Sequence, residues 1–260
     1  MARILVTGGT GVLGRQLVPR LKAAGHAVRL TSRQPRPAAV PAAEWAPVQF
    51  ETGAGLAEAV EGMHLILHAA SNAAHHNRQV DVEGTRRLAN AARAAGTPHL
   101  IYVSIVGIER IPLAYYKNKV SAEEIVKACG VPWTILRATQ FHDLIDKLLT
   151  GFARFPLPFV FLPTDLKFQP VDEGETADEL VRIAARPPAG LLPDFGGPEV
   201  LRMADLAWAW FAARGLRRAI FHLPLPGATW AGYRKGYNTC PQNRSGKITW
   251  AEWLKRRLPN

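Results

Sequence analysis

Short apolar runs and segments of helical periodicity alternate along the chain up to about residue 150. Arg3–Thr7 is an apolar run that ends in glycines, and Val12–Ala24 places Leu13, Leu17 and Leu21 on one helical face. The same alternation predicts strands over Ala27–Thr31, Pro47–Phe50, His64–Ala69, His99–Ser104 and Trp133–Leu136, and helices over Leu56–Val60, Val80–Ala95 and Tyr116–Ala128. Strands separated by helices form βαβ units, so the pattern predicts an α/β fold with a parallel sheet that helices cover on both faces.

The pattern changes after about residue 150. Residues 152–170 combine prolines and aromatic residues without a clear period, and helical periodicity returns over Glu173–Ala185 and Leu201–Arg214. The proline-rich Leu223–Gly227 and a final segment, Trp250–Leu258, follow. We therefore expect residues 1–150 to form the α/β domain and residues 151–260 a smaller portion, partly folded back onto it. Ligands of doubly wound sheets bind outside the carboxyl ends of the strands, so the irregular segment is either a lid over that edge or additional packing.

The composition is that of an ordinary globular protein with unevenly distributed charge. The 260 residues are 48% hydrophobic and 20% charged, and the net charge is +11. Residues 201–260 hold 11 Lys and Arg against Asp205 and Glu252, which gives this segment +9 and leaves +2 for residues 1–200. Basic charge attracts nucleic acid, but no docking element accompanies it here. We expect no nucleic-acid partner, and a basic segment that either faces an acidic partner or stays solvated.

Three features of the sequence indicate the cellular compartment: the cysteines, the start of the chain and the hydropathy. Cys129 and Cys240 cannot build a disulfide framework and lack the paired spacing of a zinc site. A glycine loop begins at Gly8, which leaves no room for a signal peptide, and prolines interrupt the apolar runs before they could span a bilayer. We expect a cytoplasmic protein without membrane insertion. We also expect no metal, since His75-His76 has no carboxylate or cysteine at ligand spacing.

A glycine-rich loop joins the first expected strand to the first expected helix. Its sequence, Thr7-Gly-Gly-Thr-Gly-Val-Leu-Gly14, fits both Gly-x-Gly-x-x-Gly and Gly-x-x-Gly-x-x-Gly. Glycines permit a tight turn and let the backbone approach a pyrophosphate, whose charge the helix N-terminus favours. The motif predicts a dinucleotide site with contacts from Gly8, Thr10, Gly11, Val12, Leu13 and Gly14.

The end of the second expected strand bears on which dinucleotide binds. An acidic residue there accepts hydrogen bonds from the ribose 2′-hydroxyl of NAD, whereas an arginine pairs with the 2′-phosphate of NADP. The chain has Ser32 and Arg33 at this point and no carboxylate before Glu44. Arg33 offers the forked geometry that binds phosphate, with Ser32 as a further donor. The sequence favours NADP(H), with NAD(H) as the alternative if Arg33 is an ordinary exposed loop residue.

Three residues form a candidate for proton transfer. Ser104 ends the fifth expected strand, and Tyr115 stands four residues before Lys119, which puts both on one side of a helix. A nearby ammonium favours a phenolate, so we expect Lys119 to lower the pKa of Tyr115 and let it exchange a proton near neutral pH. Tyr116 competes for this role, but its partner four residues on is Val120.

Further segments follow in a characteristic order: His68-Ala-Ala-Ser71, Asp81-Val-Glu-Gly-Thr85, Tyr102-Val-Ser104, Tyr115-x-x-x-Lys119 and Phe168-Gln-Pro-Val171. Together with the glycine loop they resemble the short-chain dehydrogenase/reductase superfamily, and most closely its atypical, NmrA-like branch of NAD(P)H-binding proteins. The resemblance covers about residues 1–185. It implies a Rossmann fold, a doubly wound parallel sheet with helices on both faces, and a substrate pocket built largely from the later part of the chain.

The resemblance also assigns roles. In the superfamily a serine holds the substrate, a tyrosine donates the proton and a lysine binds the nicotinamide ribose, and these roles fall on Ser104, Tyr115 and Lys119. It further implies that Ala69 and Ala70 line the cofactor and that Thr139 lies near the nicotinamide.

Two features depart from the family pattern. Glu51 stands roughly where an aspartate commonly lies near adenine, and residues 105–114 form a loop without a counterpart. The branch also contains proteins that bind cofactor and have lost catalysis.

We therefore expect an NAD(P)H-dependent oxidoreductase, monomeric or homodimeric, that acts on a small, largely apolar carbonyl-type substrate. Its hydride comes from the nicotinamide and its proton from Tyr115. The alternatives are a non-catalytic NADP(H)-binding regulator or redox sensor, and an NAD-dependent sugar epimerase, which Arg33 disfavours.

Overall fold

The computed structural model describes residues 1–32, 44–71, 78–154 and 157–257. The chain forms two compact units, and each draws on separate stretches of the sequence. The first unit comprises residues 1–104, 114–136 and 177–192, and the second comprises residues 105–113, 137–176 and 193–260. The units therefore interleave along the chain, and a substrate-binding role for residues 151–260 stays a prediction.

A seven-stranded sheet in the order β3-β2-β1-β4-β5-β6-β9 forms the centre of the first unit. Its strands are β1 (Arg3–Thr7), β2 (Ala27–Ser32), β3 (Glu44–Pro47), β4 (Leu65–His68), β5 (Leu100–Ile105), β6 (Trp133–Ala138) and β9 (Gly190–Leu191). β1 pairs in parallel with both of its neighbours, with Ile4 opposite Val28 of β2 and Leu65 of β4. The strand order reverses beside β1, as in a Rossmann fold. The predicted doubly wound, parallel α/β fold is confirmed.

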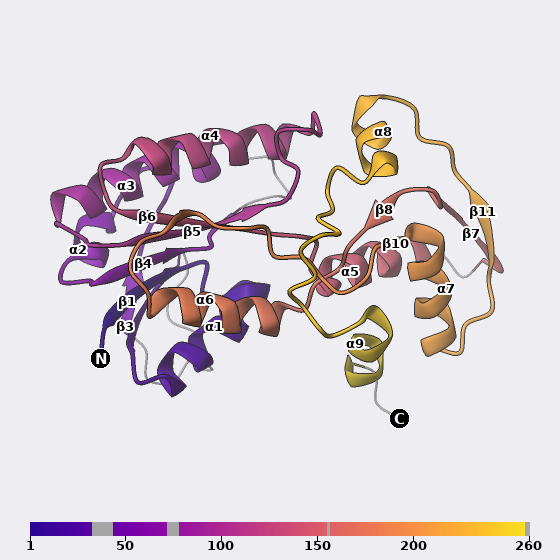
Figure 1. Cartoon of the computed structure of the whole chain (residues 1–260), viewed down its shortest axis with the longest axis horizontal. Coiled ribbons are helices and arrows are strands. Elements are labelled where there is room, and N and C mark those ends of the chain that lie inside the picture. Colours follow the sequence, from indigo (N-terminus) through magenta and orange to yellow (C-terminus); the bar gives the residue numbers. More distant parts are fainter. Residues whose placement is uncertain (33–43, 72–77, 155–156, 258–260) are drawn as a thin grey trace. The chain divides into compact units, whose positions relative to one another are not determined.

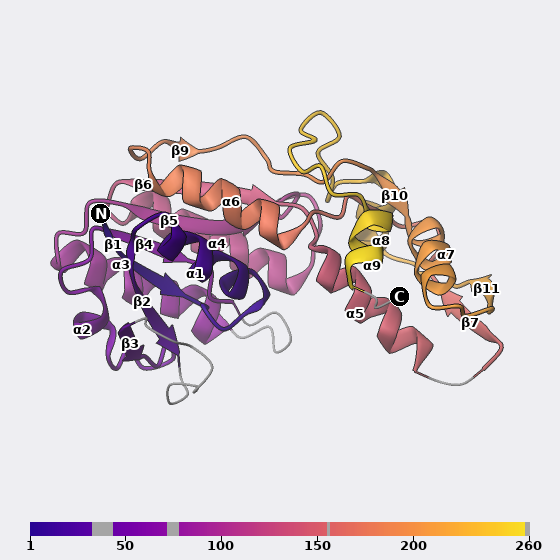
Figure 2. The same cartoon turned by 90° about the horizontal axis from the view of Figure 1, so that it is seen from below.

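Helices cover both faces of this sheet (Figure 1, with a second view in Figure 2). Helices α2 (Leu56–Val60), α3 (Thr85–Ala94) and α4 (Ala114–Ala128) lie on one face, and α1 (Val12–Ala23) and α6 (Glu173–Ala184) lie on the other. Because neither face meets solvent, all four residues of β4 are buried, and so are all but the first of β1. Such strands are continuous apolar runs rather than alternating ones.

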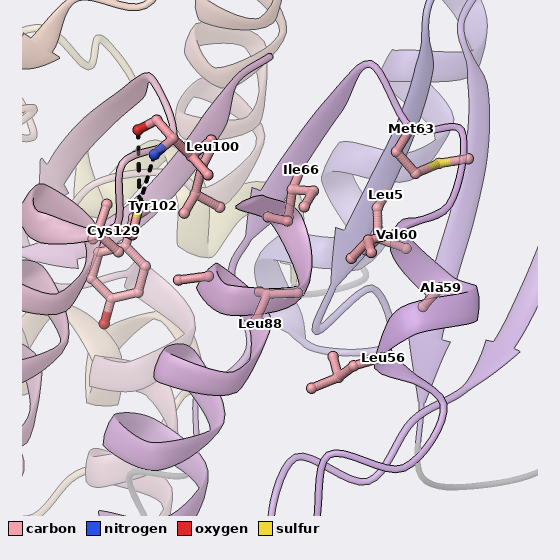
Figure 3. Close-up of a cluster of buried hydrophobic side chains, with 14 of the residues drawn as sticks. Leu5, Leu56, Ala59, Val60, Met63, Ile66, Leu88, Leu100, Tyr102 and Cys129 are labelled. Atoms are coloured by element: carbon pink, nitrogen blue, oxygen red, sulfur yellow. Dashed lines mark hydrogen bonds between the residues drawn. The ribbon is translucent and has the colours of Figure 1, made fainter. Parts of the chain in front are cut away.

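An apolar core lies between the sheet and the helices α2, α3 and α4 (Figure 3). Leu5, Ile66 and Leu100 from the strands and Leu88 of α3 belong to this core. Burying each of these side chains contributes about 1.5–3 kcal/mol. Tyr102 of β5 belongs to the same core and is 1% exposed. Its packing fixes the strand next to Val103 and Ser104, the residues that follow it.

The third strand differs from the sequence prediction. The pattern predicts a strand over Pro47–Phe50, whereas the structure has one over Glu44–Pro47. Val48 and Phe50 are buried, but the strand has ended before them and Phe50 lies in a turn, in which the Gln49 carbonyl accepts a hydrogen bond from the Gly53 amide at 2.7 Å. Their apolar character therefore reflects burial of a turn and not a strand.

The helix predicted over Val80–Ala95 begins with a π-helical turn, Gln79–Gly84, and continues as α3. Gly84 lies against Phe50, where a Cβ atom would come within 2.9 Å of the Phe50 Cβ. Single π-helical turns recur at functional sites. This one carries Asp81, which is 3% exposed.

The second unit consists of shorter elements. Strand β7 (Phe159–Leu162) pairs in parallel with β11 (Ala219–His222), and β8 (Lys167–Phe168) pairs antiparallel with β10 (Leu201–Arg202). Its helices are α5 (His142–Ala153), α7 (Met203–Ala213), α8 (Ala228–Lys235) and α9 (Trp250–Arg257). The sequence predicts α7 closely and marks the segment of α9 without assigning it a helix, but it misses α5, α8 and the short strands. Trp210, Phe211, Trp250 and Trp253 belong to a buried cluster that fills this unit.

The loop without a family counterpart belongs to the second unit. It packs there through Arg110, whose guanidinium carbon lies 3.6 Å from the centre of the Tyr237 ring. Among the residues that the structure describes, none of the helices has both the length and the apolar character needed to cross a membrane.

Candidate active site

The glycine loop makes its tight turn through contacts within the loop and with the chain after β4. Gly8 has a φ of +72°, and a Cβ atom on it would lie 2.8 Å from the Ala70 amide nitrogen. A Cβ atom on Gly14 would lie 2.5 Å from the Cα atom of Gly9. The Gly11 amide donates to the Gly8 carbonyl at 2.9 Å. A Cβ atom on Gly9 would lie 2.7 Å from a side-chain carbon of Leu30. These three glycines therefore serve close packing, and Gly11 is the exposed glycine of the loop that a ligand can approach.

Helix α1 begins directly after Gly11 and presents its N-terminus to the loop surface. Gly11 makes no side-chain cap and the first turn holds no acidic residue, so neither of them neutralises the positive end of the helix. Thr10 and Gly11 are exposed, whereas Leu13 is buried. Val12 and Leu13 would therefore contribute backbone amides to a bound pyrophosphate, with the Leu13 side chain anchored in the core.

A chain of buried hydrogen bonds joins the ends of β1 and β4 to the π-helical turn. The Ala70 amide donates to Thr7 Oγ1 at 3.2 Å, and Thr7 Oγ1 lies 2.7 Å from His68 Nδ1. His68 Nε2 lies 2.9 Å from Thr85 Oγ1, which donates to the Asp81 carbonyl at 2.7 Å. The chain fixes the backbone after β4, where Ala69 and Ala70 lie against the glycine loop.

The direction of these hydrogen bonds follows from the number of available protons. Thr85 gives its single hydroxyl hydrogen to a carbonyl, so it accepts from His68 Nε2–H, and His68 Nδ1 then accepts from Thr7. This requires a neutral imidazole. Burial lowers the pKa of His68 to about 3, and the positive charge of Lys119 acts in the same direction, so His68 is neutral at all physiological pH values.

The end of β2 supplies one unpartnered hydroxyl. Thr31 is 3% exposed, and its Oγ1 atom has no hydrogen-bond partner among the described residues. Ser32 ends the strand, where its carbonyl accepts from the Val48 amide at 3.1 Å. Arg33 and the pair His75-His76 lie outside the described residues, so the contribution of Arg33 to cofactor choice stays a prediction.

Tyr115 takes part in a three-residue hydrogen-bond arrangement. α4 begins at Ala114, two residues before the predicted start, which places Tyr115 and Lys119 on the same helix. The Tyr115 hydroxyl lies 2.7 Å from Ser71 Oγ, and Ser71 Oγ donates to Asp81 Oδ1 at 3.0 Å. The predicted proton donor is thus tied to a serine after β4 and to the carboxylate of the π-helical turn.

The pKa of Tyr115 differs in direction from the sequence expectation. Burial raises the pKa of Tyr115 to about 12, and the negative charge of Asp81 adds to the rise. The expectation that Lys119 lowers this pKa is wrong for this structure. The Lys119 ammonium instead donates to the Val103 carbonyl at 2.8 Å and lies 4.3 Å from the centre of the Tyr102 ring.

Lys119 is a buried cation, 3% exposed. Burial lowers its pKa to about 8, although the charges of Asp81 and Glu123 oppose that change. A lysine with this pKa remains mostly charged at neutral pH, and its hydrogen bond to Val103 places it beside the end of β5. A buried ammonium whose charge costs stability is a common sign of a functional site.

Ser104 follows Val103 on β5 and fits the role of a ligand donor. It is 2% exposed, and its Oγ atom has no hydrogen-bond partner in the described part of the chain. A buried polar atom without a partner costs about 1–3 kcal/mol. A ligand oxygen at this position would remove that cost.

Thr139 belongs to the second unit and has its own partners there. Its hydroxyl donates to the Gln169 carbonyl at 2.5 Å and accepts from the Gly197 amide at 3.3 Å. The structure therefore gives Thr139 a role in joining three segments of the second unit. Its contribution to cofactor binding stays a prediction.

Five residues of these hydrogen-bond arrangements were not among the predicted site residues, namely Thr7, His68, Ser71, Asp81 and Thr85. All five belong to segments that resemble family motifs, but the sequence does not show which members of a motif touch one another. The polar side chains at the ends of two apolar strands were the available indication, because buried polar groups need partners.

Substitution of Lys119 by methionine is expected to stabilise the protein near pH 7 by about 1–3 kcal/mol, because the folded chain no longer charges a buried ammonium. The pKa of Lys119 is about 8 in the folded protein, below its ordinary value of 10.5. The unfolded wild-type chain therefore binds more protons between these pH values, and wild-type stability rises with pH across that window. Urea unfolding from pH 6 to 10 measures both effects.

Lys117→Met is the matched control for this experiment, since Lys117 is exposed on the same helix. It should leave both the stability and its pH dependence within about 0.5 kcal/mol of wild type. A Lys119→Met variant that is less stable than wild type at pH 7 would contradict the assignment of Lys119 as a destabilising buried charge.

Comparison with known proteins gives a family and several relatives. A family model described as NAD(P)H-binding matches residues 8–149. A (4-alkanoyl-5-oxo-2,5-dihydrofuran-3-yl)methyl phosphate reductase of Streptomyces griseus is 32% identical over 142 residues, covering 53% of this chain and 48% of the relative. The chain spans about half the length of the curated relatives it matches.

Solved structures share the fold over nearly the whole chain. An NADPH-dependent quinone oxidoreductase of Escherichia coli, solved with NADPH, has a TM-score of 0.82 at 19% identity, with 98% of this chain and 99% of that chain covered. A nucleoside-diphosphate-sugar epimerase of Staphylococcus aureus has a TM-score of 0.80 at 16% identity, with 97% and 99% covered. These identities establish the likeness of the fold alone.

Proposed function

This chain belongs to the NAD(P)H-binding family, and from that membership we propose that it is an NAD(P)H-dependent oxidoreductase of the short-chain dehydrogenase/reductase type, in its NmrA-like branch. The proposed substrate is a small, largely apolar compound with a carbonyl-type group. The observation that carries the proposal is the placement of Tyr115 and a buried Lys119 on one helix. Lys119 donates to the carbonyl of the residue before Ser104, whose buried hydroxyl has no hydrogen-bond partner among the described residues.

The residues present fit a dinucleotide. The N-terminus of α1 has no side-chain cap and follows an exposed glycine, which suits a pyrophosphate. Thr31 and Ser104, at the carboxyl ends of β2 and β5, have buried hydroxyls without partners in the described residues. Ligands of this fold bind at that edge of the sheet. Gly11, Thr10 and the backbone of Ala69 and Ala70 would hold the cofactor there.

Each side chain then has a separate task. The bound nicotinamide supplies the hydride. Tyr115 gives its phenolic proton to the carbonyl oxygen as that oxygen gains electron density, and Ser104 donates a hydrogen bond to the same oxygen. The Lys119 ammonium has three N–H donors, and one of them binds the Val103 carbonyl. The other two would bind ribose hydroxyls of the cofactor.

The test of this proposal is the oxidation of NADPH in the presence of a panel of aldehydes, ketones and quinones. We expect wild-type protein to oxidise NADPH with at least one member. Tight binding of NADPH without oxidation across the panel would favour the regulator or redox sensor instead. NAD that stays with the protein through purification, together with interconversion of a nucleotide sugar, would favour the epimerase.

Cofactor choice is proposed to depend on Arg33. If its guanidinium pairs with the 2′-phosphate, Arg33→Ala should weaken NADPH binding by about 1.5–3 kcal/mol and change NADH binding little, because NADH lacks that phosphate. Fluorescence titration with each cofactor measures the two affinities. Arg182→Ala removes the same charge from α6 and serves as the control. Equal losses for both cofactors, or tighter wild-type binding of NADH, would contradict the NADP(H) assignment.

A further inference from the structure

Asp81 is a buried carboxylate that the proposed reaction does not use. It is 3% exposed and lies on the π-helical turn. Its Oδ1 atom accepts the Ser71 hydroxyl at 3.0 Å. Its negative charge acts on Tyr102, Tyr115 and Lys119, raising the pKa of each. The charge of Asp81 therefore acts on both Tyr115 and Lys119, the two proposed catalytic side chains on α4.

The direction of the Ser71 hydrogen bonds follows from proton counting. An ionised carboxylate can only accept hydrogen bonds, and a serine hydroxyl has one hydrogen to give. Because Ser71 gives that hydrogen to Asp81, the contact of 2.7 Å between Ser71 Oγ and the Tyr115 hydroxyl is donated by Tyr115. The resting phenol therefore directs its hydrogen toward Ser71, and the lone pairs of its oxygen are left for other partners.

We propose that Ser71 and Asp81 are positioning residues for Tyr115, in which Asp81 sets the direction of a rotatable Ser71 hydroxyl. In the protein without substrate Ser71 accepts a hydrogen bond from Tyr115. When substrate binds, the phenol turns its hydrogen to the substrate oxygen, and after proton transfer Ser71 turns its own hydrogen from Asp81 to the phenolate. This inference rests on the proposed function, in which Tyr115 exchanges a proton with the substrate.

The step balances without a protonated Asp81. In reduction the Tyr115 O–H bond breaks and a new O–H bond forms on the substrate oxygen, which has gained the hydride electrons at its carbon. Tyr115 keeps the electron pair and becomes a phenolate. Ser71 breaks no covalent bond, since only its hydrogen bond moves, and a solvent proton later restores the phenol. Ser71 is exposed in this structure, so solvent can reach this part of the site.

Other charged and titratable groups act here and must remain in place during a test. Lys119 and Glu123 lie on α4, and Tyr102 lies on β5, where its pKa responds to Tyr115, Asp81 and Glu123. Tyr116 packs beside Tyr115 with ring centres 6.1 Å apart. Substitutions at Ser71 and Asp81 leave all of these side chains unchanged.

The test is a titration of Tyr115 that needs no substrate. The five tyrosines are replaced by 3,5-difluorotyrosine, whose phenol ionises at much lower pH, and fluorine NMR follows each ring. The Tyr115 resonance is identified by its loss in Tyr115→Phe. Four proteins are compared: wild type, Ser71→Ala, Asp81→Asn, and the double variant. Ser121→Ala, on the same helix and outside the arrangement, is the control.

The proposal predicts that the effect of Ser71→Ala changes sign with residue 81. With Asp81 present, Ser71 stabilises the neutral phenol as an acceptor, so Ser71→Ala should lower the Tyr115 pKa. In the Asp81→Asn background Ser71 is free to donate to the phenolate, so Ser71→Ala should raise it. Each shift should be roughly 0.5–1 unit. Asp81→Asn alone should lower the pKa by roughly 1 unit, because a negative charge is removed.

A loss of packing would not produce this reversal. A Ser71→Ala effect of the same sign in both backgrounds, or no effect in either, would overturn the proposal. Ser71→Thr restores a hydroxyl and should return the pKa to within about 0.3 units of wild type. A carbonyl panel without turnover would contradict the proposed function alone, and the titration would still decide the role of Ser71 and Asp81.

Discussion

Replacing Tyr115 by phenylalanine is expected to slow hydride transfer by roughly 10²–10⁴-fold, because the substrate oxygen then gains charge without a positioned proton donor. The variant removes one oxygen and keeps the ring. Tyr115 is partly exposed, so packing and stability should change little. Cofactor affinity should stay near wild type as well. Single-turnover oxidation of bound NADPH measures the step without interference from product release.

Tyr116→Phe is the matched control for Tyr115. Tyr116 is 4% exposed, and its partner one helical turn on is Val120 rather than a lysine. It should retain most of the wild-type rate with any substrate found. Near wild-type transfer by Tyr115→Phe would remove this tyrosine from the mechanism and would strengthen the interpretation as a regulator that only binds cofactor.

The second large effect is expected from Gly14→Ala. A Cβ atom there would lie 2.5 Å from the Gly9 Cα and 2.6 Å from the Gly9 carbonyl carbon. These are backbone atoms of the cofactor loop, so the loop and α1 must separate. We expect a loss of about 1–3 kcal/mol in stability and roughly 100-fold weaker binding of NADPH, because loop amides moved by about 1 Å no longer meet the pyrophosphate together.

Gly151→Ala provides the control for that substitution. Gly151 lies in α5, where a Cβ atom would have no neighbour within 4 Å. The change should raise stability by about 0.5–1 kcal/mol through helix propensity and leave cofactor binding unchanged. Thermal unfolding and calorimetric titration with NADPH compare the two variants. Wild-type affinity in a folded Gly14→Ala protein would show that the loop does not hold the cofactor.

The order of elements in the first unit could be predicted because its strands are buried on both faces. Apolar runs such as Ile4–Val6 and Leu65–Leu67 are typical of strands that are covered on both faces, and the glycine loop marks the first βα turn. The strand predicted at Pro47–Phe50 failed because burial alone does not distinguish a packed turn from a strand. Its neighbours in space, not in sequence, decide which of the two forms.

The contacts within the candidate site were harder to predict from the sequence than the order of the strands and helices. Ser71, Asp81 and Tyr115 meet across 10 and 44 positions in sequence, and the π-helical turn that aims Asp81 has no signature in hydrophobic periodicity. The sign of the Tyr115 pKa shift was missed for a similar reason. The spacing places Lys119 one helical turn from Tyr115. The Lys119 ammonium instead donates a hydrogen bond to the Val103 carbonyl of β5. Two-residue strands such as β8 are too short to leave a pattern.

Deuterium transfer from NADPH labelled at both C4 positions of the nicotinamide tests the central claim most directly. The protein is mixed with the labelled cofactor and each member of the carbonyl panel, and mass spectrometry follows the label. We predict that at least one product gains a single deuterium at the former carbonyl carbon, and that Tyr115→Phe forms it at less than about a hundredth of the wild-type rate. Tight binding of NADPH with no label transferred to any member of the panel would contradict the account.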